Sequence, residues 1–220
     1  MNYYAHGLRF LDRPYFVAGT AVPDWLSVVD RKVRFRMRHV QAFLEQATGL
    51  EHEVASGILQ HLVDDDWFHK TREFVETSDE LTLLFREALP GDVGFRPAFL
   101  GHILTEMLLD SVLIEREPHR LEHYYQAFAD LDPRLIEGTV NQIAKETTDR
   151  LHIFIPLFVQ ERFLSDYGDP ELLLGRLNQV MRRVTLSPLP DNFVSALVSA
   201  RAIVEQRVEG LLAGWQTGDS

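Results

Sequence analysis

The chain has 220 residues, of which 45% are hydrophobic, and a formal net charge of -11. The apolar share predicts a folded globule, and the negative charge disfavours nucleic acid and anionic membrane surfaces as general partners. The absence of cysteine excludes disulfides, thiol catalysis and thiolate ligands, so any bound metal must be held by His, Asp or Glu.

The N-terminal stretch MNYYAHGLRFLDRP lacks the basic start and the apolar core of a signal peptide. No window approaches the ~18 consecutive apolar residues of a membrane span. We therefore expect a cytoplasmic protein without a membrane-spanning segment. Further along, GTAVPDWL carries Gly19, Pro23 and Asp24, which predicts a turn with Asp24 as a helix cap.

Most of the remaining chain has the periodicity of amphipathic helices. Lys32 to Arg38 alternates between polar and apolar residues but continues into a helical pattern, so we predict helix there as well. Asp132 before Pro133 is a typical helix start. The predicted helices span 33–46, 51–73, 78–89, 97–117, 119–129, 133–146, 147–166, 170–184 and 190–214. The sequence thus predicts an all-α fold, a single compact domain over residues 1–220 with about eight to ten helices.

Two of these helices carry polar stripes with the same spacing. The stripes consist of His61, Asp65 and His69 on one helix and of His102, Glu106 and Asp110 on the other. Residues four apart lie almost above one another on a helix, ~6 Å along its axis. The helix with His102 is otherwise apolar, so a polar stripe on it needs partners. The pattern predicts a metal site shared by the two stripes, although a single His-x3-Asp pair is usually a plain surface pair.

The helical rise limits how these residues can share an ion. His61 and His69 are ~12 Å apart along an ideal helix, whereas imidazole nitrogens bind Zn at ~2.0–2.1 Å. One possibility is that one of the two histidines does not bind the ion and only orients a ligand. The other is that two ions lie on either side of Asp65, because a bridging carboxylate fits the ~3.5–4 Å between the metals of dinuclear hydrolytic sites. Asp64 and Asp66 point away from the stripe and are predicted to be solvated or capping groups.

Several motifs resemble bacterial acyl carrier protein phosphodiesterases. They are the opening Met1-Asn2-Tyr3-Tyr4-Ala5-His6, the pair Gly19 and Asp24, and Gly57-Ile58-x-x-His61-x-x-x-Asp65, with His102 as a later histidine on an apolar helix. The likeness covers roughly the first half of the chain. It implies an HD-domain-like metallohydrolase with a divalent metal, typically Mn, that cleaves the phosphodiester between 4′-phosphopantetheine and a serine of the carrier protein. The ligands that it implies are His6, Asp24, His61, Asp65 and His102.

The chain also resembles zinc-dependent phospholipase C and S1/P1-type nucleases, which are helical as well. Those enzymes use an early His, a distant Asp, a His-x3-Asp helix followed by His, and a later His-x3-Glu. The matching residues here are His6, Asp24, His61, Asp65, His69, His102 and Glu106. Those enzymes are exported and use their mature N-terminal amino group as a ligand, so we interpret this likeness as a shared metal architecture.

These patterns favour a metal-dependent phosphodiester hydrolase with one or two divalent ions, Mn or Zn first and Fe also compatible. The candidate catalytic carboxylates are Asp65, Glu106 and Asp110. A basic stretch at 31–39 adds Arg34, Arg38 and His39 as groups for a phosphate or for an acidic partner such as the carrier protein, the alternative being a solvated helix face. A phospholipase C-like hydrolase, a non-enzymatic helical interaction domain with a structural metal, and an iron oxidase stay open.

Overall fold

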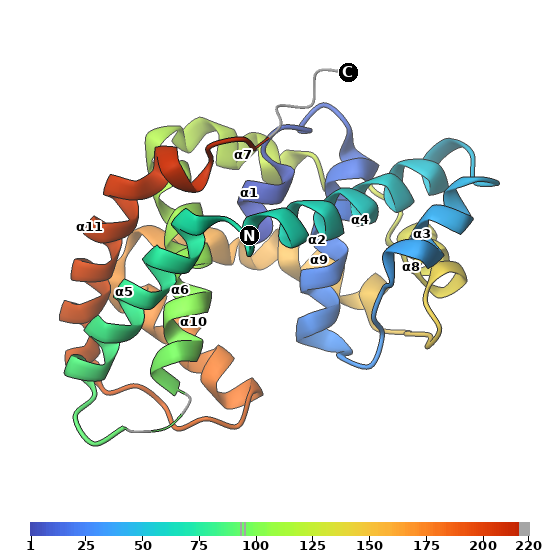
Figure 1. The fold of residues 1–220 in the computed structure, drawn as a ribbon. Coiled ribbons are helices and arrows are strands. Elements are labelled where there is room, and N and C mark those ends of the chain that lie inside the picture. The colour runs from blue at the N-terminus through green and yellow to red at the C-terminus, as the bar shows by residue number, and fades with distance from the viewer. Residues whose placement is uncertain (93, 95, 216–220) are drawn as a thin grey trace. The chain divides into compact units, whose positions relative to one another are not determined.

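The computed structural model describes residues 1–92, 94 and 96–215, and every regular element in this part of the chain is helical (Figure 1). These residues divide into two compact units. Among the described residues, the first unit contains Asn2–Asp66 and Pro118–Arg162, and the second contains Met1, Trp67–Glu117 and residues 163–215. The all-α prediction is confirmed, and the assignment of residues 1–220 to one domain stays a prediction.

The first unit is built around an aromatic core. Trp25 is fully buried, with its ring centroid 5.6 Å from that of Phe128 and 5.3 Å from that of Phe158. Prolines stand at the first position of several helices, where the missing N–H has no helical partner in any case. The helices of this unit are α1 (Tyr3–Gly7), α2 (Pro14–Val29), α3 (Met37–Leu44), α4 (Gly49–Phe68), α7 (Pro118–Gln126), α8 (Pro133–Ile143) and α9 (Leu151–Glu161).

The second unit packs α5 (Arg72–Ala88), α6 (Arg96–Arg116) and α11 (Val194–Leu211) against one another (Figure 1). Its other elements are η1 (Phe163–Gly168), α10 (Pro170–Arg183) and η2 (Asp191–Phe193). Helix α6 is long and apolar enough to cross a membrane by composition, but 67% of its apolar window is buried within the protein. A central helix of a globular core has this same composition.

The predicted turn around Gly19 and Pro23 is wrong, because both residues lie inside the continuous helix α2. Nearly all of this helix from Phe16 to Leu26 is buried. A helix that is buried on most sides lacks a polar face, so its sequence has no 3.6-residue period to detect. Because α2 continues to Val29, Asp24 lies within this helix and does not cap one.

Other predicted helical stretches differ as well, among them 147–166, of which only Leu151–Glu161 is α-helical. Residues 31–36 are not helical: Arg31 and Lys32 form a turn, and Arg36 has extended backbone angles. Along 33–36 buried or half-buried side chains alternate with exposed ones, as in an extended chain. The helix predicted over 51–73 ends at Phe68. A new helix begins at Arg72, where the Thr71 hydroxyl accepts a hydrogen bond from the backbone N–H of Phe74. His69 therefore lies in a short connection and not on the helix that carries His61 and Asp65.

Candidate metal centres

The described residues contain two groups whose ligand atoms all lie within 4.8 Å of one another. His6, His61 and Asp65 form one group, which we call the buried centre, and it lies in the first unit. His69, His102 and Glu106 form the other, which we call the open centre, and it lies in the second unit. Each group has two histidines and one carboxylate, and the predicted stripe from His61 to His69 is divided between them.

A close crossing of α2 and α4 positions the buried centre. A Cβ atom on Gly57 would clash with the carbonyl oxygen of Phe16 and would lie 2.8 Å from the Cα atom of Gly19. Only glycine permits backbones to approach so closely. Because His61 is one helical turn beyond Gly57, the crossing brings its Nδ1 atom to 2.8 Å from the carbonyl oxygen of Thr20.

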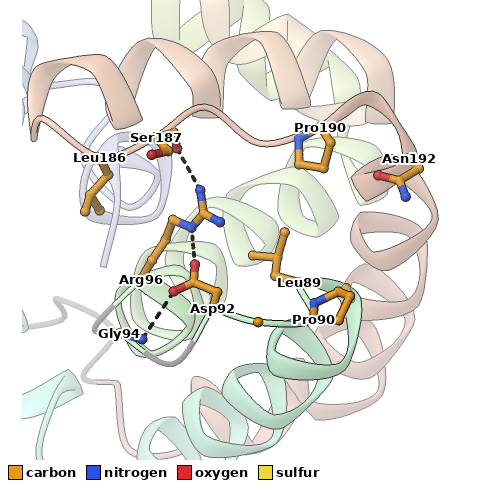
Figure 2. A pocket seen from close by; sticks show the side chains of 11 residues that line it. Leu89, Pro90, Asp92, Gly94, Arg96, Leu186, Ser187, Pro190 and Asn192 are labelled. Atoms are coloured by element: carbon orange, nitrogen blue, oxygen red, sulfur yellow. Dashed lines mark hydrogen bonds and ion pairs between the residues drawn. The ribbon is translucent and has the colours of Figure 1, made fainter.

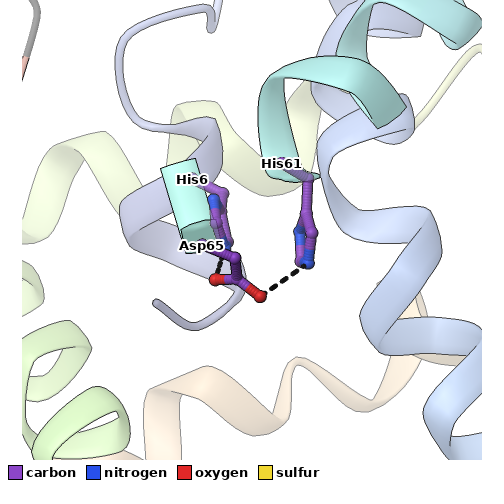
Figure 3. A group of neighbouring side chains, drawn as sticks. All are labelled: His6, His61 and Asp65. Atoms are coloured by element: carbon purple, nitrogen blue, oxygen red, sulfur yellow. Dashed lines mark ion pairs between the residues drawn. The ribbon is translucent and has the colours of Figure 1, made fainter. Parts of the chain in front are cut away.

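The two histidines of the buried centre direct the same ring atom toward one carboxylate (Figure 3). His6 Nε2 is 3.2 Å from Asp65 Oδ1, and His61 Nε2 is 3.4 Å from Asp65 Oδ2. Their rings stack with centroids 4.0 Å apart. The side chain of His6 is fully buried and that of His61 is 4% exposed, while Asp65 is 31% exposed and opens the group to solvent.

The Nδ1 atoms of both histidines face acceptors. A carbonyl oxygen can only accept, so the contact with Thr20 places a proton on His61 Nδ1, and Nε2 is the ring atom that faces Asp65 and is available to a metal ion. His6 Nδ1 lies 3.5 Å from Asp64 Oδ2. Neither ring nitrogen of His6 makes a hydrogen bond of regular geometry, although both are buried. Metal-binding histidines in proteins have their second nitrogen directed at a carboxylate or carbonyl in this way.

Asp64 is itself held in place by two neighbours. Arg9 Nη2 donates to both carboxylate oxygens, at 3.2 and 3.0 Å, and the Gln60 side-chain amide donates at 2.9 Å. Burial raises the pKa of Asp64, but the adjacent His6 and Arg9 more than offset it, so the net pKa lies below the usual range. Asp64 thus acts as an anion that is only 4% exposed. The prediction that it is a solvated or capping group is wrong.

Asp65 is strongly stabilised as a carboxylate. Burial raises its pKa, but the imidazoles of His6 and His61 outweigh that effect and hold the pKa well below its ordinary range. The run Asp64-Asp65-Asp66 is therefore tolerated because its members have different surroundings: Asp64 meets Arg9, Asp65 meets the two imidazoles, and Asp66 is exposed as predicted.

The open centre is built from the connection after α4 and from one face of α6. His69 Nε2 is 2.6 Å from Glu106 Oε1, and His102 Nε2 is 3.5 Å from the same oxygen. The amino group of Met1 also lies 3.5 Å from it. The side chains of His102, His69 and Glu106 are 49%, 32% and 15% exposed, so this group is much more accessible than the buried centre.

Other predicted site residues lie outside both groups. Asp24 is in α2, and Asp110 is fully buried on α6, one turn beyond Glu106. In the basic stretch, the Arg34 guanidinium donates to the carbonyl of Arg31 and the Arg38 guanidinium to His39. These side chains therefore interact within their own segment. Their predicted roles as ligand, base or phosphate-binding groups stay predictions.

A cavity of about 610 Å³ in the second unit contains no member of either centre. It is lined by the end of α5, the connection to α6 and the start of α6, and by part of the loop before α11: Ala88, Leu89, Pro90, Gly91, Asp92, Gly94, Arg96, Leu186, Ser187, Pro190 and Asn192. Arg96 crosses it, paired with Asp92 and donating to the Ser187 carbonyl at 3.0 Å (Figure 2). The cationic group of this cavity is thus already engaged by protein acceptors.

No protein-family model, no curated protein and no solved structure matches this chain. The likeness to carrier protein phosphodiesterases accordingly stays an expectation. Arg9, Gln60 and the carbonyl of Thr20 were not predicted as parts of the site. Arg9 is 55 residues from Asp64 in the chain, and a backbone carbonyl leaves no signature in a sequence.

Proposed function

We propose that this protein hydrolyses a phosphate ester with a divalent metal ion held by His6, His61 and Asp65. One observation supports this above all: two buried imidazole Nε2 atoms converge on one carboxylate, at 3.2 and 3.4 Å. Two nitrogens and a carboxylate, without thiolates, suit Mn, Zn or Fe.

The donor geometry fits such an ion. Metal–ligand bonds of ~2.0–2.1 Å in a tetrahedral arrangement separate neighbouring ligand atoms by about 3.4 Å, close to the two distances above. The Thr20 carbonyl keeps His61 in the tautomer that a ligand needs, and Asp64 faces the second nitrogen of His6. When bound, a divalent cation would supply Lewis acidity, lowering the pKa of water and neutralising charge on phosphate oxygens.

The accessible side of the buried centre and the basic stretch of the same unit support a hydrolase of anionic substrates. Asp65 is the one ligand with a sizeable exposed fraction, 31%, so access is from its side. The exposed Arg34 and Arg38 in the same unit concentrate positive charge in a protein whose net charge is -11. We propose that they attract an acidic partner, with 4′-phosphopantetheine attached to an acyl carrier protein as the preferred substrate class.

The burial of the two histidines also favours a second candidate, a helical interaction domain with a structural metal. Structural sites are closed, and the His6 and His61 side chains are 0% and 4% exposed. Ile153 and Leu157, one turn apart on α9, are 58% and 47% exposed and would suit a partner surface.

One comparison separates these candidates. The wild type and the Asp65→Ala variant are reconstituted with Mn²⁺ or Zn²⁺, and metal content is measured beside hydrolysis of bis(4-nitrophenyl) phosphate and of pantetheinylated carrier protein. We expect Asp65→Ala to lose one metal equivalent and at least about 100-fold in kcat/KM. Asp66→Ala, which removes the exposed neighbouring charge, is the matched control.

Each other result has a distinct meaning. A metal content unchanged in Asp65→Ala would contradict the proposal that the buried centre binds a metal ion. If the variant loses its metal but the wild type cleaves neither phosphodiester, the result would contradict the hydrolase and favour the interaction domain.

A further inference from the structure

The open centre has the features of a metal site in its own right. Its three ligand atoms come from the connection after α4 and from α6, and they converge on Glu106 Oε1 at 2.6 Å from His69 and 3.5 Å from His102. The two imidazole centroids are 4.8 Å apart. None of these side chains belongs to the buried centre, and none is needed for the proposed hydrolysis.

Aromatic packing fixes both imidazoles before any ligand arrives. The ring of Phe74 lies 4.9 Å from that of His69 and 5.1 Å from that of His102. Phe74 is itself 4% exposed, and its backbone N–H donates to Thr71. The Thr71 hydroxyl also donates to the Phe68 carbonyl, which closes the turn that presents His69.

The backbone of α6 is held just as firmly next to His102. Gly101 faces α5 so closely that an added Cβ atom would lie 2.5 Å from the Ser78 carbonyl oxygen. The close contact leaves the following residue, His102, directed outward with a 49% exposed side chain. Glu106 is on the same face because it is four residues later. Rigid supports of this kind limit the reorganisation that ligand binding would require.

We propose that His69, His102 and Glu106 form a second, independent site for a divalent transition-metal ion. Two imidazoles and a carboxylate prefer Zn²⁺, Mn²⁺ or Fe²⁺ over Mg²⁺ and Ca²⁺, which prefer oxygen ligands. The exposure of His102 leaves coordination positions open to water or to an exogenous anion, in contrast with the buried centre. This inference stands whether or not the buried centre is catalytic.

The test counts zinc equivalents in the full chain. The protein is stripped with chelator, dialysed against Zn²⁺ and analysed for bound metal by elemental analysis and by calorimetric titration. We expect two equivalents in the wild type, one in His102→Ala, one in Asp65→Ala and none in the double variant. Glu106→Gln keeps the side-chain shape and should also retain only one equivalent.

His152→Ala is the matched control. His152 Nδ1 lies 2.9 Å from Glu137 Oε1 in the first unit, and this pair is not part of either three-ligand group. The His152→Ala variant should therefore bind two equivalents of zinc, like the wild type. Circular dichroism and the thermal midpoint of the metal-free proteins check that each variant is folded, which we expect for the exposed His102.

The outcomes separate this inference from the proposed function. Two equivalents retained in both His102→Ala and Glu106→Gln would overturn the second site. A single wild-type equivalent that is lost only in Asp65→Ala would also overturn it, while leaving the buried centre intact. A single equivalent lost in His102→Ala but kept in Asp65→Ala would support the second site and contradict the buried centre. Displacement of zinc from the open centre by a 100-fold excess of Mg²⁺ would contradict its preference for imidazole-binding metals.

Discussion

The buried centre and the open centre contain the same side chains, two histidines and one carboxylate, but they are supported by different means. In the buried centre, the Nδ1 atoms of His6 and His61 face a carboxylate and a carbonyl, and both rings are nearly inaccessible. In the open centre, the ring of Phe74 contacts both imidazoles, whose outer edges reach solvent. Similar donor sets can thus be preorganised by polar contacts or by packing.

The two forms of support imply different sensitivities. Polar support fixes the tautomer and raises the basicity of a ligand, but it requires buried charges to stay paired. Aromatic support fixes orientation alone and tolerates changes of charge nearby. We therefore expect substitutions in the surroundings of the buried centre to have large effects there and little effect on the open centre.

The largest effect is expected from Gly57→Ala. A Cβ atom at this position would clash with the Phe16 carbonyl and approach Gly19 Cα to 2.8 Å, so α2 and α4 would have to separate. We expect the free energy of unfolding to fall by about 3 kcal/mol or more, because neither contact is with a flexible side chain. The buried centre should lose its metal, since the Thr20–His61 contact depends on this crossing. Urea denaturation and metal content measure the two effects.

Gly138→Ala is the control for this change. Gly138 lies in α8 of the same unit, and an added Cβ atom there meets nothing within 4 Å. Alanine in a helix interior is favoured over glycine, so stability should rise by about 0.5–1 kcal/mol. If Gly57→Ala were as stable as Gly138→Ala, the close helix crossing would be wrong.

A smaller effect is expected from Asp64→Asn. The asparagine amide is neutral and has one oxygen instead of two, so it cannot accept from Arg9 and also present an anionic oxygen to His6. His6 should then lose its orientation. Removing such a supporting carboxylate typically weakens metal binding about 10–100-fold. Asp66→Asn removes the same charge from an exposed position two residues later and should leave affinity unchanged. Equal affinities in the two variants, by calorimetric titration, would show that Asp64 does not position His6.

The sequence predicted the class of the fold, and its candidate residues include those that the structure brings together in the two centres. Helical periodicity was sufficient for α6 and α10, and Asp132 caps α8 as expected. The His-x3-Asp and His-x3-Glu spacings correctly placed His61 beside Asp65 and His102 beside Glu106. These successes are local, because they depend only on the geometry of one helix.

The failures involve contacts between distant segments. The four-residue spacing suggested that His69 continues the stripe of His61, but α4 ends at Phe68, and His69 in the connection packs against His102 of α6 instead. The pairing of Arg9 with Asp64 depends on tertiary packing, and the helical periodicity of the sequence gives no information on such contacts between distant segments. Burial of α2 on most sides removed the polar face that would have identified it as a helix.

The effect of pH is the last and smallest expected difference, because it develops only in acid. Arg9 and the imidazoles of His6 and His61 hold the pKa values of Asp64 and Asp65 below the usual range, against the effect of burial. In the unfolded chain these groups titrate near ~3.9. The folded protein therefore binds fewer protons than the unfolded chain around and below that pH, and its free energy of unfolding should fall as pH decreases below about 5.

Asp64→Asn should make this decrease shallower, because it removes one of the two carboxylates beside the buried histidines whose pKa is lowered. Asp66→Asn, which removes a charge from an exposed position, is the control. Urea unfolding of chelator-treated protein at a series of pH values from 6 to 3 measures the slopes without a contribution from metal release. Parallel curves for the two variants would mean that Asp64 is not stabilised as an anion in the fold. A shallower curve for Asp64→Asn alone would show that the charge of the buried centre is stabilised by the protein itself, so that its preorganisation precedes any metal.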